Sequence, residues 1–212
     1  MKKARSNLSN LTSKDHICEV ALIAFGKFGY SGANITKIAA DAGVSQPNVH
    51  YHFKSKRDLW EASMRHLGAS LERDIAAQQE LYGLLSPLDK LKASCLLLIE
   101  NAVNRPVLGQ VILNEGTSGG ERLDWLLRNV LSGMYYDLQE AVEACVQEGL
   151  IKSFKPYQLL MFLIGAAVTQ FNVAPLVHSV FGEDPLTTEN VADFKAMYLE
   201  ILFNGLMCEE QE

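Results

Sequence analysis

Residues that could carry out catalysis or hold a metal ion are few in this sequence and stand apart from one another. His50 and His52 are two positions apart, so their imidazoles would point to different sides of a helix, and no third ligand follows at a metal-binding spacing. The four cysteines form no CxxC pair and are expected to be reduced, buried thiols; they stand at positions 18, 95, 145 and 208. The sequence therefore predicts neither an enzyme nor a metal or cofactor site.

The charges of the chain are divided unevenly along its length. The net charge is −6 over 212 residues, yet residues 1–60 hold nine Lys and Arg against four Asp and Glu, a net of +5. The remaining residues therefore carry a net of −11. A basic segment joined to an acidic body is typical of a protein whose one end meets a polyanion.

Hydrophobic residues repeat with the period of an α-helix wherever a period is clear, so the predicted fold class is all-α. A first helix is expected to open at Thr12 and to end at Gly29. A second is expected after Asn34, a good N-cap, and stops at Gly43. A third covers Gln46 to His52 with Ser45 as its cap, and Pro47 is tolerated in its first turn.

Two short helices joined by a glycine turn form a helix-turn-helix, which the first helix supports. Ile38, Val44, Val49 and Phe53 are the expected core of this unit. A fourth helix is expected to begin at Ser55, with an acid three residues on, and to run past residue 75.

Five further helices are expected, which makes about nine in all. They cover about 88–104, a short stretch after Pro106, about 123–149, 156–181 with a kink near Pro175, and about 188–205. The longest apolar run, 159–168, is about half of the roughly 20 residues that a membrane helix needs. With no apolar stretch after the basic N-terminus, the sequence predicts a cytoplasmic protein without a membrane partner.

Residues 15–60 resemble the DNA-binding domain of the TetR-type regulators, relatives of the tetracycline repressor. The resemblance covers about a quarter of the chain. It rests on residues in the family's order and spacing, namely Ala21, Phe25, Gly29-Tyr30, Ile38-Ala39, Ala42-Gly43-Val44-Ser45, Tyr51-His52-Phe53, Ser55-Lys56 and Leu59.

The resemblance implies a homodimer whose two third helices enter successive major grooves of a palindromic operator in double-stranded DNA. Carried over by position, the first turn of the third helix faces the bases with Ser45, Gln46, Pro47 and Asn48. The amides of Gln46 and Asn48 are the candidates for base reading, because an amide both donates to and accepts from an adenine edge.

The resemblance also implies phosphate contacts. Asn34 stands at the family's N-cap position beside a phosphate, and His52 and Lys56 match its phosphate contacts. Two residues depart from the pattern, since Thr36 replaces an arginine that reaches a base in several members and His50 replaces a tyrosine that binds phosphate. Thr36 is suited to a phosphate hydrogen bond instead. Tyr51 is expected either to pack against the head or to touch the DNA backbone.

The family forms its dimer by pairing the last two helices with their copies, and its body holds a small-molecule effector of unknown identity here. Segment 156–206 is also similar to the pyrimidine-responsive branch. Pocket candidates are polar or aromatic groups on apolar helices, which can instead be satisfied by neighbouring carbonyls: Asn101, Asn114, Trp125, Arg128, Tyr135, Gln170 and Asn172. Glu115 and Arg128 are expected to pair with each other or with solvent.

Together these features predict a helix-turn-helix DNA-binding domain over residues 1–58, with a flexible basic arm at 1–11, and a helical effector and dimerisation domain over 59–212. The expected function is a ligand-responsive transcription repressor that an effector releases from its operator. The alternative is a DNA-binding or interaction protein that responds to no effector.

Overall fold

The computed structural model describes residues 13–207, except for the side chains of residues 74–81. These residues fall into two compact units, one with the chain up to Ala77 and Gln110–Leu131, the other with Gln78–Gly109 and the chain from Ser132 on. Helix is the regular structure throughout the described part, apart from one isolated β-bridge between Ile151 and Met207. The prediction of an all-α fold is confirmed.

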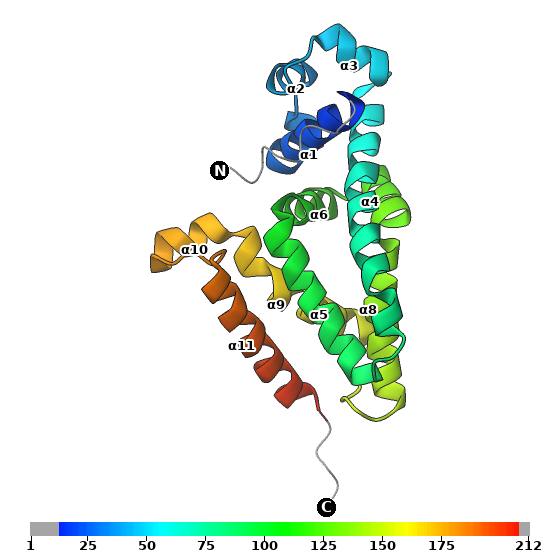
Figure 1. The fold of residues 1–212 in the computed structure, drawn as a ribbon, viewed down its shortest axis with the longest axis vertical. Coiled ribbons are helices and arrows are strands. Elements are labelled where there is room, and N and C mark those ends of the chain that lie inside the picture. Colours follow the sequence, from blue (N-terminus) through cyan, green and yellow to red (C-terminus); the bar gives the residue numbers. More distant parts are fainter. Residues whose placement is uncertain (1–12, 208–212) are drawn as a thin grey trace, which may run out of the picture. The chain divides into compact units, whose positions relative to one another are not determined.

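The first unit begins with four helices, which Figure 1 shows in blue to cyan. They are α1 (Ser13–Gly32), α2 (Ile35–Asp41), α3 (Gln46–His52) and α4 (Lys56–Tyr82). The expected opening of α1 at Thr12 lies outside the described residues. The helical conformation of α1 is broken at Gly29, where φ is +66° and ψ is 173°, which glycine adopts without a Cβ clash. The expected end of the first helix at Gly29 therefore coincides with a break inside α1.

Side-chain caps hold the two short helices of the helix-turn-helix. The Asn34 side-chain oxygen accepts hydrogen bonds from the backbone N–H groups of Thr36, at 2.8 Å, and Lys37, at 3.2 Å. The Ser45 hydroxyl accepts one from the N–H of Asn48, at 3.4 Å. These bonds satisfy donors that have no partner within their own helix, so local sequence is enough to start both helices.

The start of α4 is capped from both directions. The Ser55 hydroxyl accepts from the backbone N–H of Asp58, at 3.0 Å, and the Asp58 carboxylate accepts from the N–H of Lys54, also at 3.0 Å. The core beneath the caps contains Ile38, Val49 and Phe53 as expected, while Val44 is half-buried. Other buried members of the head core are Ile17, Phe25, Leu59, Trp60 and Met64.

The first unit also contains the larger part of α6 (Pro106–Ser118), all of α7 (Glu121–Leu126) and the π-helical turn that follows α7. A single π-helical turn, η2 (Leu127–Leu131), follows α7 without a break and leads into α8 (Ser132–Gln147). The glycine pair Gly119 and Gly120 separates α6 from α7 with positive φ angles of 65° and 81°. The chain reverses there because these angles are accessible to glycine.

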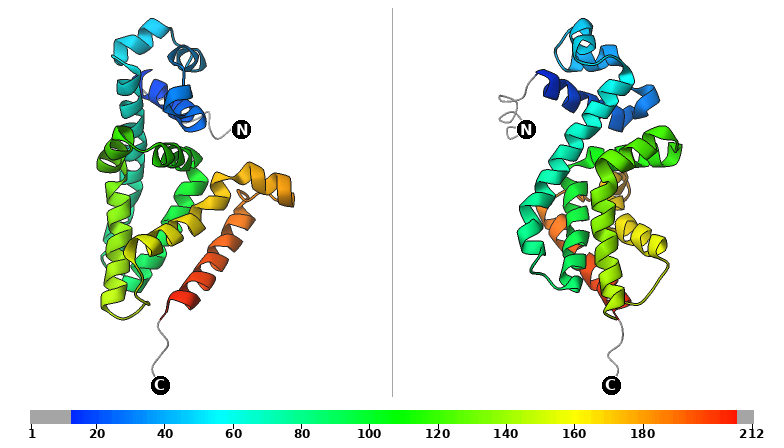
Figure 2. Two further views of the ribbon diagram at one scale, coloured as in Figure 1. Left: turned by 180° about the vertical axis from the view of Figure 1, so that it is seen from behind. Right: turned by 90° about the vertical axis from the view of Figure 1, so that its right-hand side faces the viewer.

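The second unit is a helical bundle in which α5 (Pro87–Asn104) packs against α8 and α9 (Pro156–Asn172). Figure 2 shows α5 and α8 running side by side in green and yellow-green. Helix α11 (Thr188–Leu206) adds to the same core. The Tyr198 hydroxyl on α11 donates to the backbone carbonyl of Leu163 on α9, at 2.8 Å, so this buried polar group is satisfied.

The helix expected over 156–181 is in fact two helices, which corrects the expected number of helices. α9 ends at Asn172, and α10 (Ala174–Phe181) departs from it at a bend of 67°. Pro175 explains the break, because it has no N–H to donate and its ring clashes with the carbonyl four residues earlier, whereas proline is tolerated in the first turn of α10. With α7, η2 and α8 counted as one continuous helix, residues 13–207 form ten helices instead of nine.

Within residues 13–207, no individual helix combines the length and hydropathy needed to cross a membrane. Two strongly bent helix pairs, α5 with α6 and α9 with α10, meet that criterion only when each pair is taken together.

Candidate nucleic-acid interface

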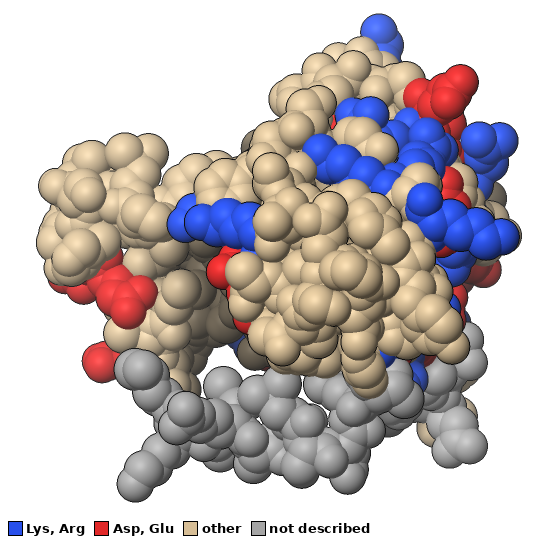
Figure 3. Space-filling model, turned by 90° about the horizontal axis from the view of Figure 1, so that it is seen from above, with Lys and Arg blue, Asp and Glu red and all other residues tan. Residues whose placement is uncertain are grey.

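The residues expected to contact DNA all lie in the first unit, on α2, on α3 and around the caps of α2, α3 and α4. Their side chains are exposed apart from His52 and Lys56, which are half-buried; the set comprises Asn34, Thr36, Ser45, Gln46, Pro47, Asn48, His50, Tyr51, His52 and Lys56. Figure 3 looks onto the end that bears α2 and α3 and shows a largely uncharged surface with blue lysine and arginine groups gathered beside it. An uncharged polar surface flanked by cations suits base reading beside phosphate contacts.

Helix α3 is anchored on one side and open on the other. Val49, with 1% of its surface exposed, fixes the helix against the core, whereas Gln46 and Asn48 stand on the exposed side. Tyr51 is 85% exposed, with its ring centre 5.1 Å from that of His52. Tyr51 thus contacts the neighbouring His52 but lies outside the core of the head.

The Gln46 side chain has a polar neighbour at each end of its amide. The Thr36 hydroxyl donates to Gln46 Oε1, at 3.1 Å, across the gap between α2 and α3. On the other side, Gln46 Nε2 lies 3.4 Å from His50 Nε2, one turn further along α3. The two residues that depart from the family pattern thus both contact a candidate for base reading.

Lys56 is held by contacts within the protein. Its ammonium group donates to the backbone carbonyl of Ser31, at 3.1 Å, and lies 5.0 Å from the centre of the Tyr30 ring. Partial burial lowers the pKa of Lys56, and the nearby positive charge of Arg122 lowers it further. The ammonium therefore has a defined position at the start of α4, beside the cap that precedes it.

Three of the effector-pocket candidates belong to the first unit, and protein groups already contact each of them. Asn114 on α6 donates from its amide to the carbonyl of Gly26 in α1, at 2.8 Å. Trp125 on α7 packs against Trp60 of α4 with ring centres 5.4 Å apart, and the Arg65 guanidinium lies 4.9 Å from its ring centre. Arg128 is exposed and donates to the carbonyl of Asp124, at 3.0 Å.

The other four candidates, Asn101, Tyr135, Gln170 and Asn172, belong to the second unit. Asn101 is buried, and its side-chain oxygen accepts from Arg105, at 2.7 Å. Burial raises the pKa of Tyr135. The side-chain oxygen of Asn172 is buried without a hydrogen-bond partner. A buried carbonyl oxygen without a donor is costly, so Asn172 is the candidate with the clearest need for a ligand or water.

A buried ion pair that sequence reasoning missed lies between α6 and α7. Glu115 is 2% exposed, and its carboxylate accepts from Arg122 Nε at 2.9 Å, so it pairs with neither Arg128 nor solvent. The Arg122 guanidinium also lies 4.4 Å from the centre of the Tyr30 ring. Residues that contact each other along one helix are three or four positions apart. Glu115 and Arg122 are separated by the Gly119-Gly120 turn, and Tyr30 is far from Arg122 in the sequence. The sequence therefore carries no local signal for either contact.

Metal-binding and nucleophilic groups are sparse in the structure as in the sequence. Among the side chains that the structure describes, no group of three His, Cys, Asp or Glu could hold a metal ion. The buried thiols of Cys18, Cys95 and Cys145 are free, and burial raises the pKa of each to about 11. Such thiols are poor nucleophiles at neutral pH.

A three-helix head with a capped and exposed third helix is the architecture of a helix-turn-helix DNA-binding domain. Residues 17–63 match the model of a family described as bacterial regulatory proteins, tetR family. The head is therefore similar to this family of transcriptional regulators, and the resemblance that the sequence predicts is confirmed.

The similarity to known regulators extends beyond the head. The HTH-type transcriptional regulator RutR of Escherichia coli K12 is 28% identical over 170 residues, which cover 80% of this chain and 78% of RutR. The ketosteroid transcriptional regulator KstR2 of Mycobacterium tuberculosis shares the fold, with a TM-score of 0.71 at 15% identity over 93% of this chain and 96% of KstR2.

A second solved structure with the same fold contains a ligand. It is the transcriptional regulator FadR of Bacillus subtilis in complex with stearoyl-CoA, with a TM-score of 0.65 at 18% identity, covering 90% of this chain and 97% of FadR. At this level of identity the likeness concerns the fold alone.

Proposed function

We propose that this protein is a ligand-responsive repressor that binds a palindromic operator as a homodimer and leaves it when a small molecule binds the body. The observation that carries the proposal is the exposed first turn of α3, where Ser45 caps the helix and Gln46 and Asn48 face outward. Amide side chains at the start of a recognition helix are the groups that read base edges.

Cations placed around α3 support the same function. Lys37 is exposed on α2, and Lys54, Lys56 and Arg57 stand at the start of α4. Positive charges on either side of a reading helix bind the phosphates of the two strands and fix the helix in its groove. We expect Asn34, His52 and Lys56 to contact phosphate, and Asn48 to read a base.

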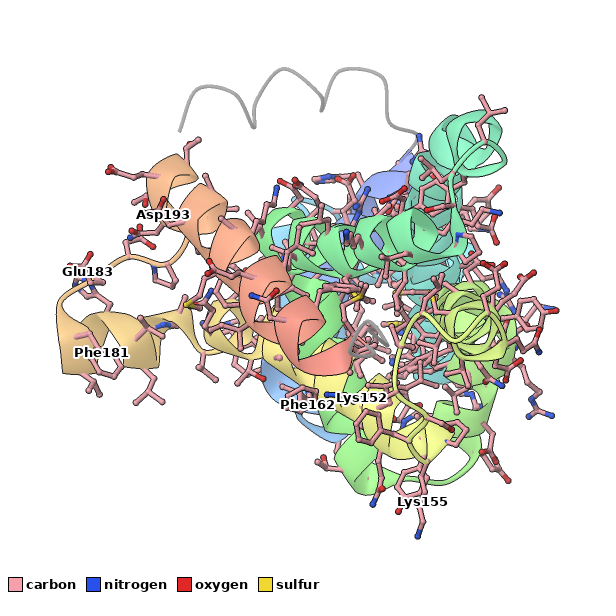
Figure 4. The ribbon with its side chains drawn as sticks, turned by 90° about the horizontal axis from the view of Figure 1, so that it is seen from below. Lys152, Lys155, Phe162, Phe181, Glu183 and Asp193 are labelled. Carbon is pink, nitrogen blue, oxygen red and sulfur yellow. The ribbon has the colours of Figure 1, made fainter. Side chains whose placement is uncertain are left out.

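Dimerisation is proposed for the face that α9 and α11 present. Large apolar side chains are exposed there, including Phe162 at 58% and Ile201 at 63%. Both side chains line a groove of about 440 Å³. Its full lining is Phe154, Gln158, Leu159, Phe162, Ile201, Leu202, Gly205 and Leu206. Figure 4 shows this part of the chain, with Phe162 on α9 and Phe181 at the end of α10. So much exposed apolar surface is typical of an interface.

The effector response is proposed to reach the head through α6 and α7. The Asn114 amide ties α6 to α1, and Trp125 ties α7 to α4. An effector that moves these helices would therefore displace α1 and α4 and change how α3 is presented. An effector that prefers the released conformation about a hundredfold contributes roughly 2.7 kcal/mol per site. We expect Asn101, Tyr135, Gln170 and Asn172 to take part in effector binding.

The experiment that tests the proposal is selection of bound duplexes from a random DNA library, followed by gel-shift affinities of the selected duplex at two salt concentrations. A palindrome bound by a dimer at least about a thousandfold more tightly than random DNA is expected. Weak, strongly salt-dependent binding without a preferred sequence would contradict the proposal, because it would leave only non-specific attraction to phosphate.

A further inference from the structure

Thr36, Gln46 and His50 form a hydrogen-bonded chain on the exposed face of the helix-turn-helix. The Thr36 hydroxyl lies 3.1 Å from Gln46 Oε1, and Gln46 Nε2 lies 3.4 Å from His50 Nε2. All three side chains are exposed, so this hydrogen-bonded chain of side chains lies on the surface that would face DNA. An inference about its role rests on the DNA-binding function proposed above.

This hydrogen-bonded chain anchors the Gln46 amide at both of its ends. Its oxygen end is held by a hydroxyl donor on α2, and its nitrogen end lies against an imidazole nitrogen on α3. For Gln46 to donate to His50, His50 Nε2 must be unprotonated, which places the ring proton of a neutral histidine on Nδ1. Reversal of the amide would require a new pairing at both ends, with the Thr36 hydroxyl as acceptor and the ring proton of His50 on Nε2, so the orientation of the amide is coupled to the tautomer of His50.

The hydrogen-bonding sites of Gln46 that Thr36 and His50 do not occupy are complementary to one base. A glutamine amide has two acceptor sites on oxygen and two N–H donors on nitrogen, and the chain occupies one of each. One acceptor site on the oxygen and one N–H donor remain. The major-groove edge of adenine offers an N–H donor at N6 and an acceptor at N7, which is the complementary pair.

We propose that Thr36 and His50 are positioning residues that hold the Gln46 amide in the orientation that reads adenine. A free glutamine amide can rotate and present donor and acceptor in either order, so it discriminates less among bases. Holding it in one orientation before binding also lowers the side-chain entropy lost on association. Thr36 and His50 thereby act on specificity through Gln46 and not through bases of their own.

This role differs measurably from phosphate contact, which the family's tyrosine makes at the position of His50 and to which the Thr36 hydroxyl is also suited. Removal of a phosphate-binding side chain weakens binding to all sequences alike and flattens the salt dependence. Removal of a positioning residue reduces discrimination at one base pair in each half-site and leaves the other pairs and the salt dependence unchanged.

The test is duplex selection with the full-length protein and a set of matched variants. Gln46→Ala identifies the base pair that Gln46 reads, where the wild type is expected to prefer adenine about tenfold or more. Thr36→Val keeps the shape of the side chain but removes the hydroxyl, and His50→Phe removes the ring nitrogens. Both are expected to lower the preference at that same pair to about threefold or less. Thr36→Ser restores the hydroxyl and is expected to restore the preference.

Lys37→Ala supplies the comparison for removal of a charge beside the same helix, since it should weaken binding without changing any base preference. Unchanged preference at the Gln46 pair in Thr36→Val and His50→Phe would overturn the inference while leaving the proposed function intact. A uniform loss of affinity in these two variants, with a flatter salt dependence, would overturn it in favour of phosphate contact. A wild type that selects no sequence would remove the proposed function, and this inference with it.

Discussion

The guanidinium of Arg122 on α7 lies over the ring of Tyr30 in α1, 4.4 Å from its centre. The ammonium of Lys56 lies over the same ring at 5.0 Å, so one aromatic side chain contacts two cations from different helices. The Tyr30 ring also stacks with Phe25 and meets Trp60 edge to face. Tyr30 therefore joins the core of the head to a proposed phosphate contact and to α7.

Replacing Tyr30 with leucine is expected to lower the free energy of unfolding by about 2 kcal/mol, since cation–π and aromatic pair contacts are each worth about 1 kcal/mol. Tyr30→Phe keeps the ring and both cations and should lie within about 0.5 kcal/mol of the wild type. Urea denaturation followed by circular dichroism measures both. Equal losses in the two variants would show that the hydroxyl, and not the ring, matters.

Removing Arg122 should destabilise the protein strongly, because it leaves the carboxylate of Glu115 buried without its partner. We expect Arg122→Ala to cost about 3 kcal/mol. The double variant Glu115→Leu, Arg122→Met removes both charges and should cost about 1 kcal/mol or less. Denaturant unfolding of the wild type and both variants gives the comparison. A double variant no more stable than Arg122→Ala would contradict this account of the pair.

Lys56→Ala is expected to weaken binding to every DNA sequence and to flatten the dependence of affinity on salt. The slope of log K against log salt should fall by about 0.9 for each phosphate that the variant no longer neutralises. Gel-shift titrations at several salt concentrations measure it, with Lys90→Ala on α5 as a control for the removal of a lysine elsewhere. An unchanged slope would mean that the Lys56 ammonium contacts only Ser31 and Tyr30.

The buried thiols should make stability depend on alkaline pH. Burial raises the pKa of Cys18, Cys95 and Cys145 from 9.0 to about 11 in the folded state. Between these values the unfolded chain releases thiol protons that the folded chain retains, so the free energy of unfolding falls as pH rises. Each thiol contributes a loss of up to about 1.4 kcal/mol per pH unit in that window.

Urea unfolding at pH 8, 9 and 10 measures this decline, and replacing Cys95 with alanine should make the decline shallower. In the native protein at pH 8, a thiol reagent should leave these three cysteines unmodified while the protein stays folded. Rapid labelling of Cys95 under those conditions would contradict the burial described here.

A charge placed on the proposed dimer face should separate the protomers. Phe162→Asp is expected to convert a dimer to a monomer at micromolar concentration, since an unpaired carboxylate would be buried in an apolar interface. Tyr136→Asp, at a side chain 68% exposed on α8, is the matched control and should leave the dimer unchanged. Sedimentation velocity distinguishes the two. A Phe162→Asp variant that remains dimeric would place the interface elsewhere.

Much of the head could be predicted from sequence because its determinants are local. Asn34 and Ser45 cap helices within three residues of themselves, and Gly43 ends α2 with a φ of +68°. The break near Pro175 was likewise expected as a kink, since proline acts on the turn in which it stands. The bend there is 67°, which is large enough to divide the expected helix into α9 and α10.

Contacts between distant segments were decided by the tertiary structure. Glu115 pairs with Arg122 and not with Arg128, because the Gly119-Gly120 turn brings the start of α7 back towards α6. The effector candidate Asn114 donates a hydrogen bond to α1, and Trp125 packs against Trp60 of α4, which no periodicity reveals. A polar residue on an apolar helix marks a need for a partner, but only the packed chain selects which partner it finds.

The amino-acid sequence by itself determined the all-helical class, the caps and the family to which the head belongs, because these depend on neighbours within one or two turns. The tertiary structure decided the hydrogen bond between Thr36 and Gln46, since Thr36 is ten positions away on another helix. A hydrogen bond between helices requires both to be folded and docked, and its geometry is absent from either segment alone.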